Sequence, residues 1–144
     1  LSDINCALGL SQIKKLNKFI NYRKKVFLFY KKELSGLKVE LNYEPENVHN
    51  SAWITTLVLD ESYSMDKDTV IEELKKLGVP SRPFFYPLSS LPAFDLSNVK
   101  RAAYKGNNRN SYKISNRGIN LPGAYNLEED QLKFIIDSIK KVLE

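Results

Sequence analysis

The feature that most constrains this chain is a regular apolar stripe near its end. Between residues 127 and 143, apolar side chains recur every three or four positions, namely Leu132, Ile135, Ile136, Ile139, Val142 and Leu143. That spacing predicts an amphipathic helix with one apolar face. We expect this face to share a single core with the other apolar-faced segments of the chain.

The middle of the chain holds those other segments. Residues 53–59 (WITTLVL) are rich in β-branched side chains and predict the clearest strand, and alternation over 37–41 predicts a second, half-buried strand. Residues 69–77 predict a short helix with its N-cap at Asp66 or Asp68 and its end at Gly78. Helices around a few separated strands predict an α+β fold with a short antiparallel or mixed sheet packed against helices.

The remaining segments are assigned more coarsely. Helical periodicity runs from Ile4 to Gly36, as one long helix or two consecutive ones. Prolines keep residues 79–86 extended, and residues 118–122 (GINLP) form another short extended piece. Residues 87–110 are expected to be a loop with a short helix near 99–105.

Size and composition exclude several classes of protein. The chain has 144 residues, which fits one domain, and no apolar run approaches the length that a membrane span needs. The one cysteine, Cys6, excludes an internal disulfide and favours a reducing, cytoplasmic location; its small and apolar neighbours predict a buried, inert thiol. The one histidine, His49, excludes a two-histidine catalytic or metal arrangement, and no metal site is predicted.

Positive charge is concentrated near the start of the chain. Between Lys14 and Lys38 there are nine basic residues and one acid, Glu33, while the whole chain has a net charge of +5. A basic helix can bind nucleic acid or phosphate, but it can equally be a solvated lysine face. No zinc-finger spacing, aromatic RNA-binding signature or glycine-rich loop accompanies the basic run. A solvated face is therefore the favoured interpretation, and no nucleic-acid partner is expected.

The segment richest in binding chemistry is Ser81-Arg82-Pro83-Phe84-Phe85-Tyr86-Pro87. An arginine offers a planar fork of donors to phosphate or carboxylate, and aromatic rings stack on sugars or bases. Prolines lower the entropic cost of presenting such groups. The same string also fits an edge strand with a packed aromatic cluster, and the residues alone do not separate these two interpretations.

Three strings in a fixed order identify a resemblance. They are LSDINCALGLSQIKKL at the start, SRPFFYPLSSLPAF in the middle and SNRGINLPGAYNLEEDQL near the end. Together they resemble the C-terminal part of the DegT/DnrJ/StrS family of sugar aminotransferases, and most closely its GDP-perosamine synthase-like members. These enzymes use pyridoxal 5'-phosphate (PLP) and have the aspartate-aminotransferase fold, so the resemblance implies the small C-terminal domain of a fold type I PLP enzyme.

The resemblance also implies how the parent protein is organised. In this family a large N-terminal domain carries the Schiff-base lysine and most groups that bind PLP. The chain resembles the part that follows, which accounts for a start at Leu1 without an initiator methionine. We therefore expect residues 1–144 to form a single small C-terminal domain that has no catalytic or cofactor-binding residue of its own and holds no PLP by itself.

Partners and site residues follow from the same resemblance. The family acts on nucleotide-sugars with glutamate as amino donor and forms homodimers. Its first helix packs at the dimer interface, which gives Ile4, Leu8 and Ile13 a burial partner. The loop that matches residues 82–92 reaches the active-site cleft and helps hold the substrate. The predicted substrate-binding residues are therefore Arg82, Phe85 and Tyr86, with His49 and Trp53 near the same mouth.

One departure and two alternatives stay open. Many family members have a histidine about where Ser89 stands here, so the identity of the sugar is not predicted. A non-catalytic remnant or interaction module of the same family would carry the same strings. A basic nucleic-acid-binding domain is the third and least favoured interpretation.

Overall fold

The centre of the molecule is a small antiparallel sheet. A computed structural model describes residues 2–92 and 106–144 of the chain. Four strands pair in the order β1-β2-β4-β3, with β1 at Val39–Leu41, β2 at Thr56–Leu59, β3 at Arg82–Pro83 and β4 at Gly118–Asn120. Every pairing is antiparallel, which decides between the two sheet types that the sequence left open. The predicted α+β architecture is confirmed.

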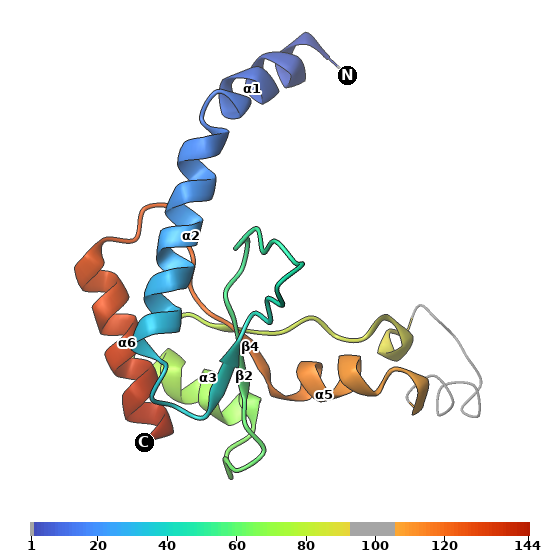
Figure 1. Cartoon of the computed structure of the whole chain (residues 1–144), viewed down its shortest axis with the longest axis vertical. Coiled ribbons are helices and arrows are strands. Elements are labelled where there is room, and N and C mark those ends of the chain that lie inside the picture. Colours follow the sequence, from blue (N-terminus) through green and yellow to red (C-terminus); the bar gives the residue numbers. More distant parts are fainter. Residues whose placement is uncertain (1, 93–105) are drawn as a thin grey trace.

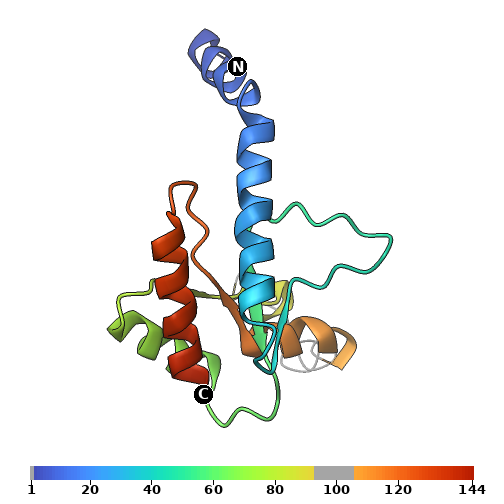
Figure 2. The same ribbon diagram turned by 60° about the vertical axis from the view of Figure 1, so that its left-hand side comes forward.

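Three helices cover one face of this sheet. They are α2 (Leu16–Glu33), α3 (Lys67–Lys76) and α6 (Glu129–Leu143), and Figures 1 and 2 show α6 running beside the lower half of α2. Their apolar faces meet the inward side chains of β2 and β4 in one core. Its buried members include Val26, Tyr30, Leu34, Leu57, Leu59, Val70, Leu74, Ile119, Ile135, Ile136 and Ile139. The stripe over 132–143 is thus buried as predicted.

Helix ends follow the capping signals in the sequence. Asp66 caps α3, because its side chain accepts a hydrogen bond from the Thr69 amide, and Gly78 ends the turn that follows with a φ of 82°. Glu128 and Gln131 form a capping box at the start of α6. Of the two predicted N-caps for α3, Asp66 is the one used.

The first helix stands apart from the body. α1 (Asp3–Ile13) is separated from α2 by a break at Lys14–Lys15, so the long helical segment is two helices. α1 contains no buried residue, and Figure 1 shows it projecting beyond the core at the end of α2. Ile4, Leu8 and Ile13 are 73%, 60% and 68% exposed. Cys6 is exposed as well, so the prediction of a buried thiol was wrong for this chain by itself.

The second face of the sheet carries a helix that the sequence did not predict. α5 (Arg109–Arg117) leads directly into β4, and the Arg117 side chain donates hydrogen bonds to the carbonyls of Leu59 and Asp60.

A short 3-10 turn, η1 (Leu88–Ser90), follows the aromatic segment. The helix predicted near 99–105 lies outside the described residues. In the part of the chain that is described, no helix is long and apolar enough to cross a membrane.

Candidate functional site

A row of polar side chains crosses three strands on the face of the sheet opposite the core. Thr56 of β2 lies opposite Asn120 of β4, which in turn lies opposite Arg82 of β3. Their sequence neighbours Leu57 and Ile119 are in the core, so side-chain alternation turns this row to the other face. Thr56 Oγ1 donates to Asn120 Oδ1 at 2.8 Å.

Arg82 ends this row without a partner for its charge. It is exposed, and among the residues described its guanidinium has neither a hydrogen bond nor an ion pair. An unpaired guanidinium at a sheet edge is a ready donor to phosphate or carboxylate oxygens. Arg82 is therefore an edge-strand residue, as one of the two sequence interpretations has it, and its role in binding stays a prediction.

Next to the row lies an aromatic stack. The rings of Trp53 and Phe85 are nearly parallel, with an interplanar angle of 18° and centroids 6.3 Å apart. Phe84 meets Phe85 edge-on at 5.6 Å and packs against the backbone position of Gly118. Trp53 and Phe85 are 62% and 57% exposed, so much of each ring stays open to a ligand.

Two adjoining hollows lie over this face. The smaller, of about 200 Å³, is lined by Trp53 and Phe85, and the other, of about 470 Å³, by His49. Both share the residues Asn42, Asn50, Ser51, Thr56 and Phe84. The structure thus brings three of the five predicted substrate-binding residues to one mouth.

His49 is held from the helical layer. Lys24 of α2 lies with its Nζ 3.1 Å from His49 Nε2, and the ammonium is the donor in this pair. This contact anchors the imidazole at the rim of the larger hollow. His49 remains exposed.

Tyr86 lies in a different environment from Phe85. Its ring faces the ammonium of Lys67, whose Nζ is 5.2 Å from the ring centroid. Lys67 is 7% exposed and also donates to the Ser115 carbonyl. Tyr86 does not line either of the two hollows described above, although its own ring is 59% exposed.

The floor of the site consists of residues that sequence reasoning missed. The Asn42 side chain donates to the Ile54 carbonyl at 2.8 Å and accepts from the Thr56 amide at 2.7 Å. Asn50 Nδ2 is buried without a hydrogen-bond partner among the described residues. Isolated asparagines form no motif, so the only available signal was their position beside the ends of the predicted strands.

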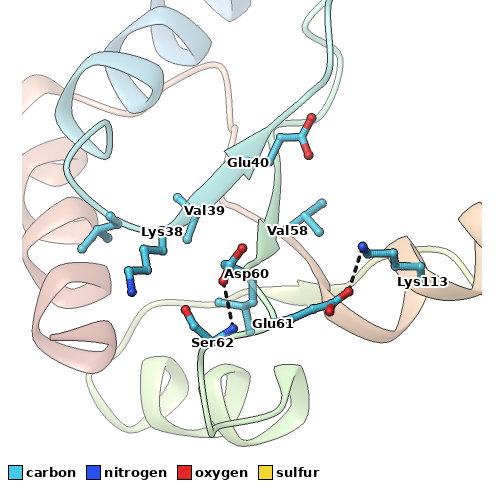
Figure 3. A pocket seen from close by; sticks show the side chains of 10 residues that line it. Lys38, Val39, Glu40, Val58, Asp60, Glu61, Ser62 and Lys113 are labelled. Carbon is cyan, nitrogen blue, oxygen red and sulfur yellow. Dashed lines mark hydrogen bonds and ion pairs between the residues drawn. The ribbon is translucent and has the colours of Figure 1, made fainter.

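A larger hollow of about 770 Å³ lies at the other end of β2, where Lys38, Glu40, Asp60 and Glu61 surround it (Figure 3). The carboxylates of Asp60 and Glu61 already have partners within the protein. Glu61 pairs with Lys113 at 2.8 Å, and this contact lowers the pKa of Glu61. Hydrogen bonds from Ser62 likewise lower the pKa of Asp60. We therefore place the candidate site at the two adjoining hollows beside the Trp53–Phe85 stack.

The described residues do not fit a PLP site. Lys67 is the buried lysine among them, and its ammonium is engaged by the Ser115 carbonyl and the Tyr86 ring rather than offered as an amine. Lys24 is likewise engaged by His49. No group of three His, Cys, Asp or Glu in the described ranges could hold a metal ion. The arrangement can bind and orient a ligand, and we assign no catalytic step to it.

Comparison with known proteins gives a consistent result. The GDP-perosamine synthase of Vibrio cholerae is 33% identical over 140 residues, covering 97% of this chain and 37% of that protein. The GDP-perosamine synthase of Caulobacter vibrioides is 27% identical over 148 residues, covering 99% of the chain and 38% of its own length. The chain therefore spans little more than a third of these relatives.

Solved structures share the fold. Helicobacter pylori PseC, an aminotransferase involved in the biosynthesis of pseudoaminic acid, superposes with a TM-score of 0.79 at 21% identity, over 99% of this chain and 38% of that one. The sugar aminotransferase CalS13 from Micromonospora echinospora gives a TM-score of 0.74 at 18% identity, over 98% and 35%. The predicted fold class is confirmed. Residues 1–140 match the family model, and the chain belongs to the DegT/DnrJ/EryC1/StrS aminotransferase family.

Proposed function

We propose that residues 1–144 form the small, C-terminal, substrate-orienting domain of a PLP-dependent aminotransferase. Its substrate is a nucleotide-linked keto-deoxy-sugar and its amino donor is glutamate, in the biosynthesis of amino-sugars for cell-surface polysaccharide. The observation that carries this proposal is the match of nearly the whole chain to GDP-perosamine synthases. Because the chain spans only about a third of them, the activity belongs to a longer polypeptide.

The site geometry supports a role in substrate orientation. The unpaired Arg82 guanidinium suits the negative charge of a nucleotide diphosphate, and the exposed Trp53 and Phe85 rings suit the flat face of a base or sugar. His49 at the rim of the larger hollow belongs to the proposed substrate-binding set. Tyr86 stays in that set on the resemblance alone, since its ring lies against Lys67 and outside both hollows. The lysine and the phosphate-binding groups for PLP belong to the preceding part of the polypeptide in this proposal.

The exposed first helix α1 supports a second subunit as the remaining partner. Ile4, Leu8 and Ile13 lie on a helix with no buried residue, an unusual exposure for such side chains in a monomer. We propose that a second subunit covers them in a homodimer. The single cysteine favours a reducing compartment, and cytoplasmic location is part of the same proposal.

The coding sequence before Leu1 and PLP trapping test this proposal together. We expect an open frame that encodes a large domain before Leu1. Borohydride reduction of the complete protein with PLP should then trap one PLP on a lysine outside residues 1–144. The isolated chain should trap no stoichiometric PLP, because its described lysines are not surrounded by groups that would bind and orient the cofactor. A stop codon directly before Leu1 would favour a non-catalytic remnant instead.

A further inference from the structure

Residues 49–53 form one wall of the site, and we call them the wall segment. Two consecutive residues of α2 hydrogen-bond to its two ends. Arg23 Nη1 donates to the Trp53 carbonyl at 2.6 Å, and Lys24 Nζ donates to His49 Nε2 at 3.1 Å. These two contacts span the wall segment from its first to its last residue. They come from the basic run whose role the sequence left open.

The wall segment has a conformation that needs such support. Ala52 has a φ of 53°, in the left-handed region that a residue with a Cβ rarely adopts, and it is 4% exposed. Its amide donates to the Asn50 side chain at 2.9 Å. This corner turns the chain so that the next residue, Trp53, reaches the Phe85 ring. Strained backbone persists where the surrounding contacts fix it.

Helix α2, which makes these contacts, is itself fixed in the core. Val26 and Tyr30 anchor the helix in the core, where they are 3% and 0% exposed. Tyr30 Oη donates to the Pro122 carbonyl at 2.9 Å, and Arg23 Nη1 also reaches the Gly123 carbonyl at 3.3 Å. The Arg23 guanidinium therefore joins the wall segment to both the helix and the segment that follows β4.

We propose that Arg23 and Lys24 are positioning residues that hold the wall segment 49–53 and thereby place the Trp53 ring against Phe85. The role in substrate binding rests on the proposed function, whereas the placement of the wall does not. Two members of the basic run are thus structural donors inside the protein. Lys25, the next residue, is exposed and has no hydrogen bond or ion pair within the described part of the chain.

Hydrogen exchange of the chain, followed by mass spectrometry, tests the placement without any ligand. In Arg23→Ala, exchange of the amides in 49–56 should rise about tenfold, because loss of a charge-assisted hydrogen bond favours local opening. Exchange in 132–139 of α6 should stay unchanged. Lys25→Ala removes the same charge from the same helix and should change neither segment. Arg23→Lys, which keeps a donor, should fall between the parent and Arg23→Ala.

Two results would overturn the proposal. One is unchanged exchange over 49–56 in Arg23→Ala. The other is an equal rise over 49–56 and 132–139, which would make Arg23 a residue of general stability. Near-ultraviolet circular dichroism gives an independent reading, because Trp53 is the only tryptophan and should lose its fixed signal in Arg23→Ala but not in Lys25→Ala.

The link to substrate is tested separately in the complete protein. Arg23→Ala should raise KM for the nucleotide-sugar about tenfold with little change in kcat, since it alters the binding wall and no reacting group. If exchange over 49–56 rises while KM is unchanged, the positioning role holds and the proposed function of this face fails.

Discussion

Arg82 lies directly opposite Asn120 across the β3–β4 pair, and the two residues have opposite hydrogen-bonding states. Asn120 accepts from Thr56, and its amide donates to the Pro83 carbonyl at 3.4 Å. The Arg82 guanidinium has no such partner among the described residues. The strand pairing therefore fixes the position of Arg82 on the sheet edge, while the donors of its guanidinium remain unused among the described residues.

Arg82→Ala in the complete protein should lower kcat/KM for the nucleotide-sugar with little effect on folding. Loss of one charge-assisted hydrogen bond costs about 1.5–3 kcal/mol, or roughly tenfold to a hundredfold in kcat/KM. Steady-state kinetics and a melting curve check this together. Arg109→Ala is the matched control, because Arg109 is exposed and, within the described ranges, its side chain bonds only the nearby Gly106 carbonyl. A lowered melting temperature with unchanged kcat/KM would assign Arg82 a structural role.

Gly118→Ala should destabilise the chain by about 1–3 kcal/mol, the usual range for overpacking. A Cβ at this position would lie 2.7 Å from the Ile114 carbonyl oxygen and 2.7 Å from Phe84 Cβ. Urea unfolding measures the loss. Gly36→Ala is the control, since its Cβ would meet nothing within 4 Å. Equal stability of the two variants would mean that α5 and Phe84 do not pack as closely on β4 as described.

The α3 cap should make stability depend on pH. The Thr69 amide and hydroxyl bond the Asp66 carboxylate and lower its pKa in the folded state. The stability that the Asp66 cap contributes to the folded state is therefore fully present above the unfolded pKa of Asp66. It is lost as the pH falls through the lowered folded pKa. Asp66→Asn should remove this acid-side loss, because an asparagine oxygen caps at any pH. Denaturation midpoints at a series of acidic pH values check this, with Asp137→Asn as control for charge alone.

Strong patterns predicted the core elements. The stripe over 132–143, the β-branched run that holds Leu57 and Leu59, and the Asp66 cap each combine a local preference with burial, so tertiary packing agrees with the local signal. β2 is nevertheless shorter than expected, because the corner at Ala52 keeps the residues just after it out of the ladder.

The elements and site residues that were missed have weak local signals. α5 is polar apart from Tyr112 and Ile114, and polar contacts of Lys113, Ser115 and Arg117 tie it to the rest of the protein. Asn42 and Asn50 come together to line the site only when β1 and β2 pair. Likewise, nothing in the sequence links Tyr86 to Lys67, which lies nineteen positions earlier.

The basic run should not make the chain a nucleic-acid-binding protein. Arg23 and Lys24 are engaged within the protein, and the other lysines of the run are exposed. We expect weak, sequence-independent binding that falls steeply with salt, because each neutralised phosphate releases counterions. Fluorescence anisotropy with labelled DNA at about 0.15 M salt measures this, and sub-micromolar affinity there would exceed ordinary non-specific binding and contradict the prediction.

Glutamate-dependent amination of a nucleotide-linked keto-deoxy-sugar tests the proposed function most directly. The assay compares the complete protein with residues 1–144 alone, each supplied with PLP, and follows the aminated nucleotide-sugar by mass spectrometry. We expect product from the complete protein, much less from its Arg82→Ala variant, and none from residues 1–144 alone. Turnover by residues 1–144 alone, or no amination of any such substrate by the complete protein, would contradict a substrate-orienting C-terminal domain.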